Sequence, residues 1–159
     1  MKKTFSLILC LILMVSCFSV QSSAVSENDA QPRVIDFSLT TPNYSLGNET
    51  RATGLILFYS LNLSASGSTL TIRAETYCNA EVVKSGFKNL VVQRRKAGST
   101  SWSDYYDYGD LYNDTYSASI VTTLVVPSGY QYRLSCKHYA KKSLLVTQSV
   151  SNTSNVVGV

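Results

Sequence analysis

The chain has 159 residues, with 14 basic and 10 acidic side chains and a formal net charge of +4 at pH 7. This length corresponds to one ordinary domain with its own hydrophobic core. Because proteins that bind nucleic acids usually carry a much larger basic excess, the composition gives no support to a DNA or RNA partner.

Residues 1–24 have the organisation of a secretion signal. Lys2 and Lys3 form a short positive region, residues 5–20 are almost wholly apolar, and small residues precede a cleavage point after Ala24. The apolar run is about 16 residues long, whereas a membrane-spanning helix needs about 20. We therefore expect a secreted, extracellular protein with no stable membrane span after cleavage and a mature net charge of about +2.

A second processing route begins at Cys17. The segment from Met14 to Cys17 loosely resembles a bacterial lipobox, in which the cysteine receives a lipid. The apolar residues that continue to Val20 fit that motif poorly. A lipid-anchored surface protein is therefore the lesser alternative to a freely secreted one.

Residues 25–52 are polar and are interrupted by Pro32, Pro42 and Gly47. A stretch of this composition buries little surface and is typical of a spacer. Residues 34–39 within it are either part of the spacer or a short strand added to a sheet edge. The folded domain is expected over residues 53–159.

From residue 53 onward, apolar and polar residues alternate with a period of two, which is the pattern of half-buried β-strands. The clearest alternation runs from Leu70 to Cys78. Gly67-Ser68, Ala97-Gly98-Ser99 and Pro127-Ser128-Gly129 supply turns between the runs. The expected strands are residues 55–63, 70–78, 87–96, 102–108, 116–126, 129–139 and 144–150.

About seven short strands joined by tight polar turns predict an all-β fold, an antiparallel two-sheet sandwich of the immunoglobulin or fibronectin III kind. A closed barrel is the main competitor. Cys78 and Cys136 favour the sandwich, because each lies late in the second or sixth strand with inward parity, and these strands face each other across the core. In an exported protein the two cysteines are expected to form a disulfide. The bridge would close a loop of 58 residues and stabilise the fold by about 4 kcal/mol. The alternative is two buried free thiols that pack as small hydrophobes.

Two segments carry a resemblance to known domains. Residues 90–102 (LVVQRRKAGSTSW) and 126–134 (VPSGYQYRL) resemble a hairpin and the sixth strand of fibronectin type III and immunoglobulin-like domains. The whole arrangement looks like an uncharacterised family of small secreted proteins of Gram-positive bacteria, over about residues 53–152. The resemblance implies a fold but no activity and no site residues. Leu134 occupies the usual place of the tyrosine-corner residue, so the resemblance does not establish a corner hydrogen bond from Tyr132.

The sequence presents no catalytic, cofactor or metal constellation. His138 is the only histidine, and its inward parity near a strand end predicts a packed side chain rather than a catalytic base. The spacing of cysteine and histidine matches no zinc motif. We therefore expect neither enzymatic activity nor a cofactor.

Residues 104–116 (DYYDYGDLYNDTY) contain five tyrosines and four aspartates. Tyrosine offers a stiff contact surface with a polar tip, so the segment is a candidate recognition patch for a glycan or a protein. The competing interpretation is ordinary strand tyrosines beside a turn, and calcium binding by the aspartates is a weaker alternative. The candidate ligand-binding residues are Tyr105, Tyr106, Tyr108, Tyr112, Asp104 and Asp107.

The sheet that carries the third and sixth expected strands is predicted to carry a basic patch, made of residues 94–96 and of Lys137, Lys141 and Lys142. Such a patch suits anionic cell-wall polymers or lipid headgroups, although strand-end charges also deter aggregation. The sequence thus predicts a secreted, non-enzymatic protein that binds an extracellular or cell-envelope ligand. A structural or spacer module without a specific ligand is the runner-up.

Overall fold

The computed structural model describes residues 33–40 and 54–159, with the backbone alone for residues 33–39. The predicted signal peptide, Cys17 and most of the predicted spacer lie outside the described residues. Within the described ranges, no helix is long and apolar enough to cross a membrane.

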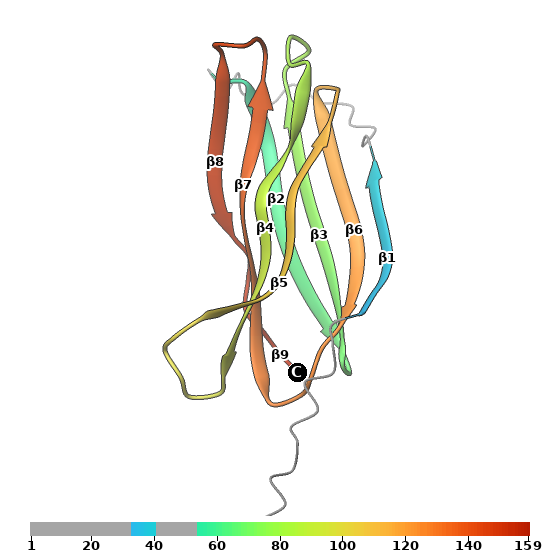
Figure 1. The fold of residues 1–159 in the computed structure, drawn as a ribbon, viewed down its shortest axis with the longest axis vertical. Helices are drawn as coiled ribbons and strands as arrows, with labels where there is room; N and C mark the ends of the chain where they lie inside the picture. The colour runs from blue at the N-terminus through green and yellow to red at the C-terminus, as the bar shows by residue number, and fades with distance from the viewer. Residues whose placement is uncertain (1–32, 41–53) are drawn as a thin grey trace, which may run out of the picture.

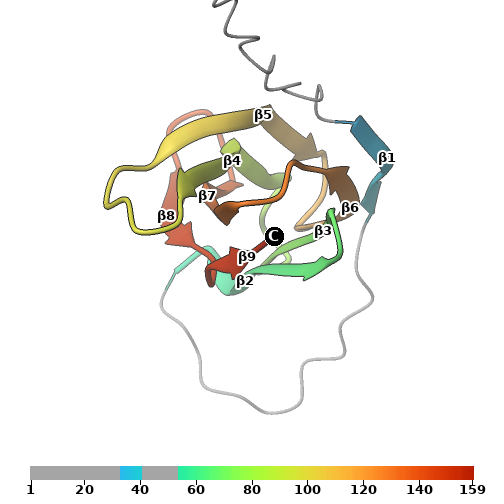
Figure 2. The ribbon, with the colours of Figure 1, turned by 90° about the horizontal axis from the view of Figure 1, so that it is seen from below.

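Nine β-strands account for most of the described residues. They are β1 (Arg33–Thr40), β2 (Ile56–Ser66), β3 (Thr69–Cys78), β4 (Lys84–Lys96), β5 (Ser103–Asn113), β6 (Ser117–Val125), β7 (Tyr130–Lys141), β8 (Thr147–Thr153) and β9 (Val157–Gly158). They form two antiparallel sheets that pack face to face, as Figures 1 and 2 show from two directions. One sheet has the order β1-β6-β3-β2, and the other has the order β5-β4-β7-β8, with β9 pairing with β7. The predicted immunoglobulin-like sandwich is confirmed.

The structure differs from the sequence-based prediction at the first and at the last long strand. The run at residues 34–39 is the edge strand β1, which pairs with β6. The last long strand begins three residues later than expected, because the Lys142 N–H donates to the Val146 carbonyl at 2.9 Å and closes a turn. This turn leaves Leu144 and Leu145 87% and 95% exposed, although both are apolar.

The core lies between the sheets and follows the predicted alternation. On β3 the inward positions Leu70, Ile72 and Ala74 are fully buried, and on β7 the same is true of Tyr132 and Leu134. Burial of such side chains, each worth about 1.5–3 kcal/mol for a large aliphatic residue, is the main stabilising contribution in a fold of this kind. The alternating pattern places the polar partners of these residues on the two outer faces.

Side-chain amides close one open side of the sandwich. Asn155 accepts a hydrogen bond from the Leu63 N–H at 3.2 Å and donates one to the Leu63 carbonyl at 2.8 Å. The side-chain oxygen of Gln148 accepts a hydrogen bond from the Ile56 N–H at 3.1 Å. These amides occupy backbone groups of the edge strand β2 that would otherwise offer a template for another strand.

The predicted disulfide is absent, and this prediction was wrong: Cys78 and Cys136 are both free and buried. Strands β3 and β7 do face each other as expected, since the Thr76 hydroxyl lies 2.8 Å from His138 Nδ1. Cys78 stands two residues beyond Thr76 and packs in a cluster with Ala140, whereas Cys136 stands two residues before His138. The thiols are therefore offset by four strand positions, roughly 13 Å at the usual rise per residue. A disulfide needs Cβ atoms about 4 Å apart.

The tyrosine-corner hydrogen bond of Tyr132, which the resemblance did not establish, is present in the structure. The Tyr132 side chain is fully buried, and its hydroxyl donates to the Pro127 carbonyl at 2.8 Å. Tyrosine corners join a hydroxyl to the backbone a few residues upstream in the same way. Here the tyrosine stands four residues before Cys136 instead of two, so the corner is kept with a shifted position.

Candidate binding face

Three of the predicted tyrosines turn toward the core. The register between β4 and β5 pairs Gln93 with Asp104 but Val92 with Tyr106, so that Tyr105 is an extra residue in a bulge. A second irregularity in the register leaves Tyr108 as an extra residue in the same way, because Val91 pairs with Asp107 and Leu90 pairs with Gly109. The two bulges interrupt the alternation, and Tyr105, Tyr106 and Tyr108 all pack half-buried against the core. They do not form a common exposed patch, and replacing them would remove core packing.

The aspartates of β5 lie on the exposed edge and are occupied by nearby donors. Asp104 accepts from Gln93 Nε2 at 2.8 Å, and Asp107 accepts from the Gly109 N–H at 2.7 Å. The backbone N–H of Asn89 and the hydroxyl of Tyr112 both donate to Asp110. These two hydrogen bonds lower the pKa of Asp110. No group of three or more acidic, cysteine or histidine side chains within residues 33–40 and 54–159 is arranged to hold a metal ion.

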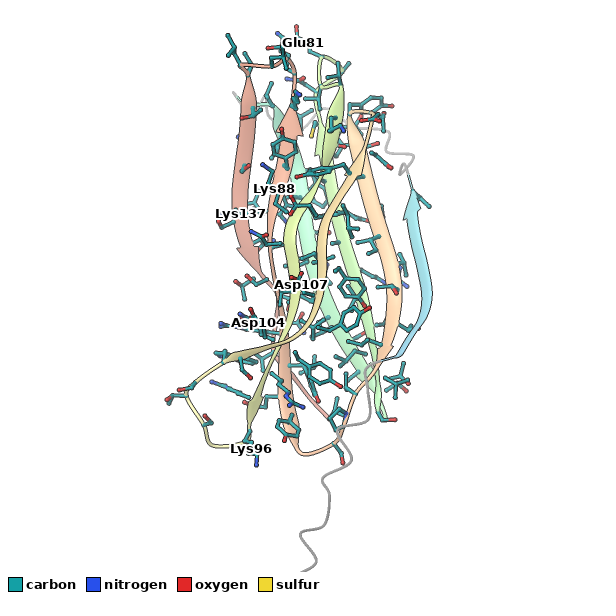
Figure 3. All side chains as sticks on the ribbon, in the orientation of Figure 1. Glu81, Lys88, Lys96, Asp104, Asp107 and Lys137 are labelled. Carbon is teal, nitrogen blue, oxygen red and sulfur yellow. The ribbon has the colours of Figure 1, made fainter. Side chains whose placement is uncertain are left out.

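Basic residues dominate the middle of the sheet β5-β4-β7-β8 on the face turned away from the other sheet, here called the outer face. Lys84 pairs in register with Lys141, and Lys88 pairs with Lys137. Figure 3 shows Lys88 and Lys137 above Asp107 and Asp104 on this sheet. Like charges placed directly opposite each other on neighbouring strands are destabilising. The arrangement is therefore not explained by the stability of the fold.

Among the described residues, some of these cations have charged or aromatic partners and others form no ion pair. Lys84 forms an ion pair with Asp114 at 2.9 Å, and the Lys88 ammonium lies 4.2 Å from the centre of the Tyr139 ring. Neither Lys137 nor Lys141 forms an ion pair with any residue of the described part of the chain. The positive charge of these two lysines is thus available on the outer face.

A depression of about 340 Å³ lies beside Lys137 on the same face. Lys137 is the only charged residue among the residues that line it. The bulge in β4 shapes one wall, because Asn89 there adopts a left-handed backbone conformation with φ of 49°, which asparagine tolerates better than most residues. Hydroxyl and amide side chains supply the rest of the polar lining. The lining residues are Asn89, Ser135, Cys136, Lys137, Ser151, Asn152 and Thr153.

A row of hydroxyls borders this depression. Every outward position of β8 is a serine or a threonine, and all four are exposed: Thr147, Ser149, Ser151 and Thr153. From edge to edge the outer face therefore carries aspartates on β5, cations on β4 and β7, and hydroxyls on β8. Hydroxyls donate and accept hydrogen bonds, so the row supplements the lysines as a surface for an oxygen-rich anion.

The β4–β5 hairpin extends the basic region beyond the body of the sandwich, as the projecting loop in Figures 1 and 2 shows. The Trp102 ring centre lies 4.6 Å from the Arg95 guanidinium and 4.3 Å from that of Arg133. Gln131 accepts from Arg95 Nε at 2.7 Å, and Gln93 accepts from Arg133 Nε at 2.9 Å. A second depression of about 410 Å³ lies here. It is lined by Arg94, Arg95, Lys96, Ser99, Ser101, Trp102, Ser103 and Tyr130.

The side chains of His138, Cys78 and Cys136 are buried, although Cys136 also belongs to the lining of the depression beside Lys137. Thr76 donates its hydroxyl proton to the Gly86 carbonyl at 3.2 Å, so the imidazole Nδ1–H is the donor in its bond to Thr76. Nε2 then accepts, with the Asn152 amide nitrogen 3.4 Å away and Cys136 Sγ 3.7 Å away. Burial lowers the pKa of His138 to about 4 and raises the pKa of Cys136 to about 12. An activated cysteine–histidine pair has a thiol pKa shifted in the opposite direction.

The structure brings together only some of the residues of the predicted basic patch. Of these residues, Arg95, Lys137 and Lys141 lie on the outer face, whereas Arg94 stacks on Tyr105 and Lys142 pairs with Glu81. Sequence reasoning missed the other contributors, which are Lys84, Lys88, Asn89, Arg133 and the hydroxyl row of β8. A signal was present on β7, where Arg133, Lys137 and Lys141 recur at even spacing and so share one face.

Comparisons with known proteins add little to this picture. No protein-family model matches the chain, and no curated protein matches it. Among solved structures, the chain is similar to ACE19, the collagen binding subdomain of the Enterococcus faecalis surface protein ACE. The identity is 9%, the alignment covers 66% of this chain and 97% of that one, and the TM-score is 0.32. At these values the likeness supports no inference about function, and the resemblance to secreted proteins of Gram-positive bacteria stays a prediction.

Proposed function

We propose that this protein is a secreted, non-enzymatic β-sandwich that binds an anionic group at the cell surface or outside the cell. The proposed site is the outer face around Lys88 and Lys137. The observation that carries the proposal is the in-register pairing of these two lysines beside a depression lined by hydroxyl and amide groups. The cost of opposing two cations is offset when an anion lies between or above them.

The chemistry of the depression suits a carboxylate, sulfate or phosphate group. Lys137 supplies a charged donor, and Ser135, Ser151 and Thr153 supply neutral donors within the same lining. Hydrogen bonds in which one partner is charged are roughly twice as strong as neutral ones. Within the described residues the neighbouring aspartates form no ion pair with Lys137. Hydrogen bonds from the Asn89 N–H and the Tyr112 hydroxyl lower the pKa of Asp110, and the charge of Lys88 adds to this effect, so Lys137 is the cation of the pair that is left for a ligand.

The other parts of the proposal have separate support. Secretion is supported by the positive and apolar organisation of residues 1–24. The non-enzymatic assignment is supported by the burial of His138 and by the shifts of its pKa and that of Cys136, which favour the neutral forms of both. Buried neutral groups of this kind serve packing and hydrogen bonding better than proton transfer with a substrate.

The experiment compares two variants of equal net charge, Lys137→Gln and Arg73→Gln. Arg73 is exposed on β3, in the sheet that does not carry the proposed site. The probe is a resin that bears immobilised sulfate groups, and the readout is the salt concentration that elutes each protein. We expect Lys137→Gln to elute well before the parent protein and Arg73→Gln to elute close to it.

Urea unfolding of both variants serves as the folding control, because neither side chain is part of the core. If the two variants elute together, retention reflects net charge alone and the proposed site is refuted. If the parent protein is not retained at all, the binding of anions is refuted altogether, and the spacer interpretation is favoured instead.

A further inference from the structure

The basic residues of the outer face are arranged as rungs along the strands. On β7 they are Arg133, Lys137 and Lys141. Each lies four positions after the one before it, a step of roughly 13 Å at the usual rise of a strand. Each rung is completed by its partner on β4. Lys141 pairs with Lys84, Lys137 pairs with Lys88, and Arg133 pairs with Gln93. The three rungs span roughly 26 Å in one line.

The rows on either side of the rungs fix the direction in which a ligand would lie. Strand β5 places Asp104, Asp107 and Asp110 along one border, and strand β8 places its exposed hydroxyls along the other. A negatively charged chain that crossed the strands would meet the aspartates. A chain that follows β7 keeps its charges over the cations and its other groups beside the hydroxyls of β8.

We propose that the ligand is a linear anionic polysaccharide that lies lengthwise along β7 and contacts all three rungs. This inference rests on the proposed function, because the middle rung is the anion site described above. Charge complementarity favours a polyanion, since cations repeat along a line, as opposed pairs at two rungs and as Arg133 alone at the third, instead of converging on a single point. The hydroxyl row favours a polymer rich in hydroxyl groups, which donate to and accept from serine and threonine alike.

Single-stranded nucleic acid is the polyanion that this face suits less. Its binding sites combine a basic groove with exposed aromatic faces on which bases stack. Here the aromatic rings are already engaged by cations: Trp102 by Arg95 and Arg133, and Tyr139 by Lys88. The small net charge of the chain also argues against a nucleic-acid partner, because nucleic-acid-binding domains usually carry a larger basic excess.

The experiment measures the affinity of the protein for a sulfated dextran disaccharide and for the decasaccharide of the same series. The disaccharide reaches one rung, whereas the decasaccharide reaches all three. We expect the longer chain to bind at least about tenfold more tightly, because its second and third contacts form within one complex. A single-stranded oligonucleotide of equal charge is the comparison polyanion, and it is expected to bind more weakly than the decasaccharide.

Variants at the rungs separate this inference from the proposed function. Lys141→Gln is expected to weaken binding of the decasaccharide several-fold and to leave that of the disaccharide unchanged. Lys137→Gln is expected to weaken both, and Arg73→Gln neither. Equal affinity for short and long saccharides would overturn the lengthwise arrangement, while the effect of Lys137→Gln on the disaccharide would still support the anion site. An oligonucleotide that binds as tightly as the decasaccharide would overturn the choice of a polysaccharide.

Discussion

The buried histidine is expected to make this sandwich sensitive to mild acid. His138 has no exposed surface, and its Nε2 faces two donors, the Asn152 amide and the Cys136 thiol. Adding a proton to Nε2 would replace an accepted hydrogen bond by a contact between donors and would place a charge in the core. Acid should therefore favour the unfolded chain, in which the imidazole is hydrated.

The size of the effect follows from the two pKa values of His138. Burial lowers its pKa from 6.5 to about 4 in the folded protein. Because the folded value is the lower one, the contribution to stability is complete above pH 6.5 and is lost as the pH falls toward 4. Linkage then gives a loss of about 2 kcal/mol at about pH 5 and about 3 kcal/mol at about pH 4. Such a loss is a large share of the net stability of a domain.

The assay is urea unfolding of the parent protein and of His138→Gln over this pH range. Glutamine keeps a donor and an acceptor but does not titrate, so the carboxylates contribute equally to both curves. The variant is expected to be less stable at neutral pH and to have a much flatter pH dependence. Parallel loss of stability in the two proteins between pH 6.5 and 4 would refute the reasoning.

Three further predictions concern single positions. Tyr132→Phe should lower the free energy of unfolding by about 1–2 kcal/mol in urea titrations, since a half-buried carbonyl loses its donor; an unchanged midpoint would contradict this. Gly86→Ala should cost about 2–3 kcal/mol or more, because its Cβ would overlap a backbone oxygen of β5, whereas Gly158→Ala has open space and should cost far less. Cys78 and Cys136 should resist alkylation in the native protein, because burial raises the pKa of each thiol to about 12, and both should react after unfolding without reductant. Mass spectrometry would show no adducts after unfolding if they were bridged.

Local patterns explain why the sequence predicted most of the strands but not their ends. Alternation identifies a strand when one face is buried, as it does from Leu70 to Cys78. It misplaced the start of β8, because Leu144 and Leu145 are apolar residues in an exposed turn. Hydrophobicity alone cannot distinguish such a turn from a strand whose side chains are buried.

The candidate site was harder to predict because it depends on registers between distant strands. The tyrosines of residues 105–108 appeared to be a surface patch, yet two bulges in β5 turn them toward the core. Conversely, Lys88 and Lys137 lie 49 residues apart in the chain and meet only because β4 and β7 pair in a specific register. A shift of one residue would move every side chain of a strand to the other face.

The sequence by itself determined the all-β class and the inward parity of Cys78, Cys136 and His138, because a period of two is a local property of the chain; it favoured the two-layer arrangement over a closed barrel without deciding between them. Only the tertiary structure decided which residues meet across the core and along the outer face. The four-residue offset that separates the two thiols and the alignment that opposes the lysines are both set by how whole strands slide against one another. That choice reflects the packing of the complete core, which no short segment encodes.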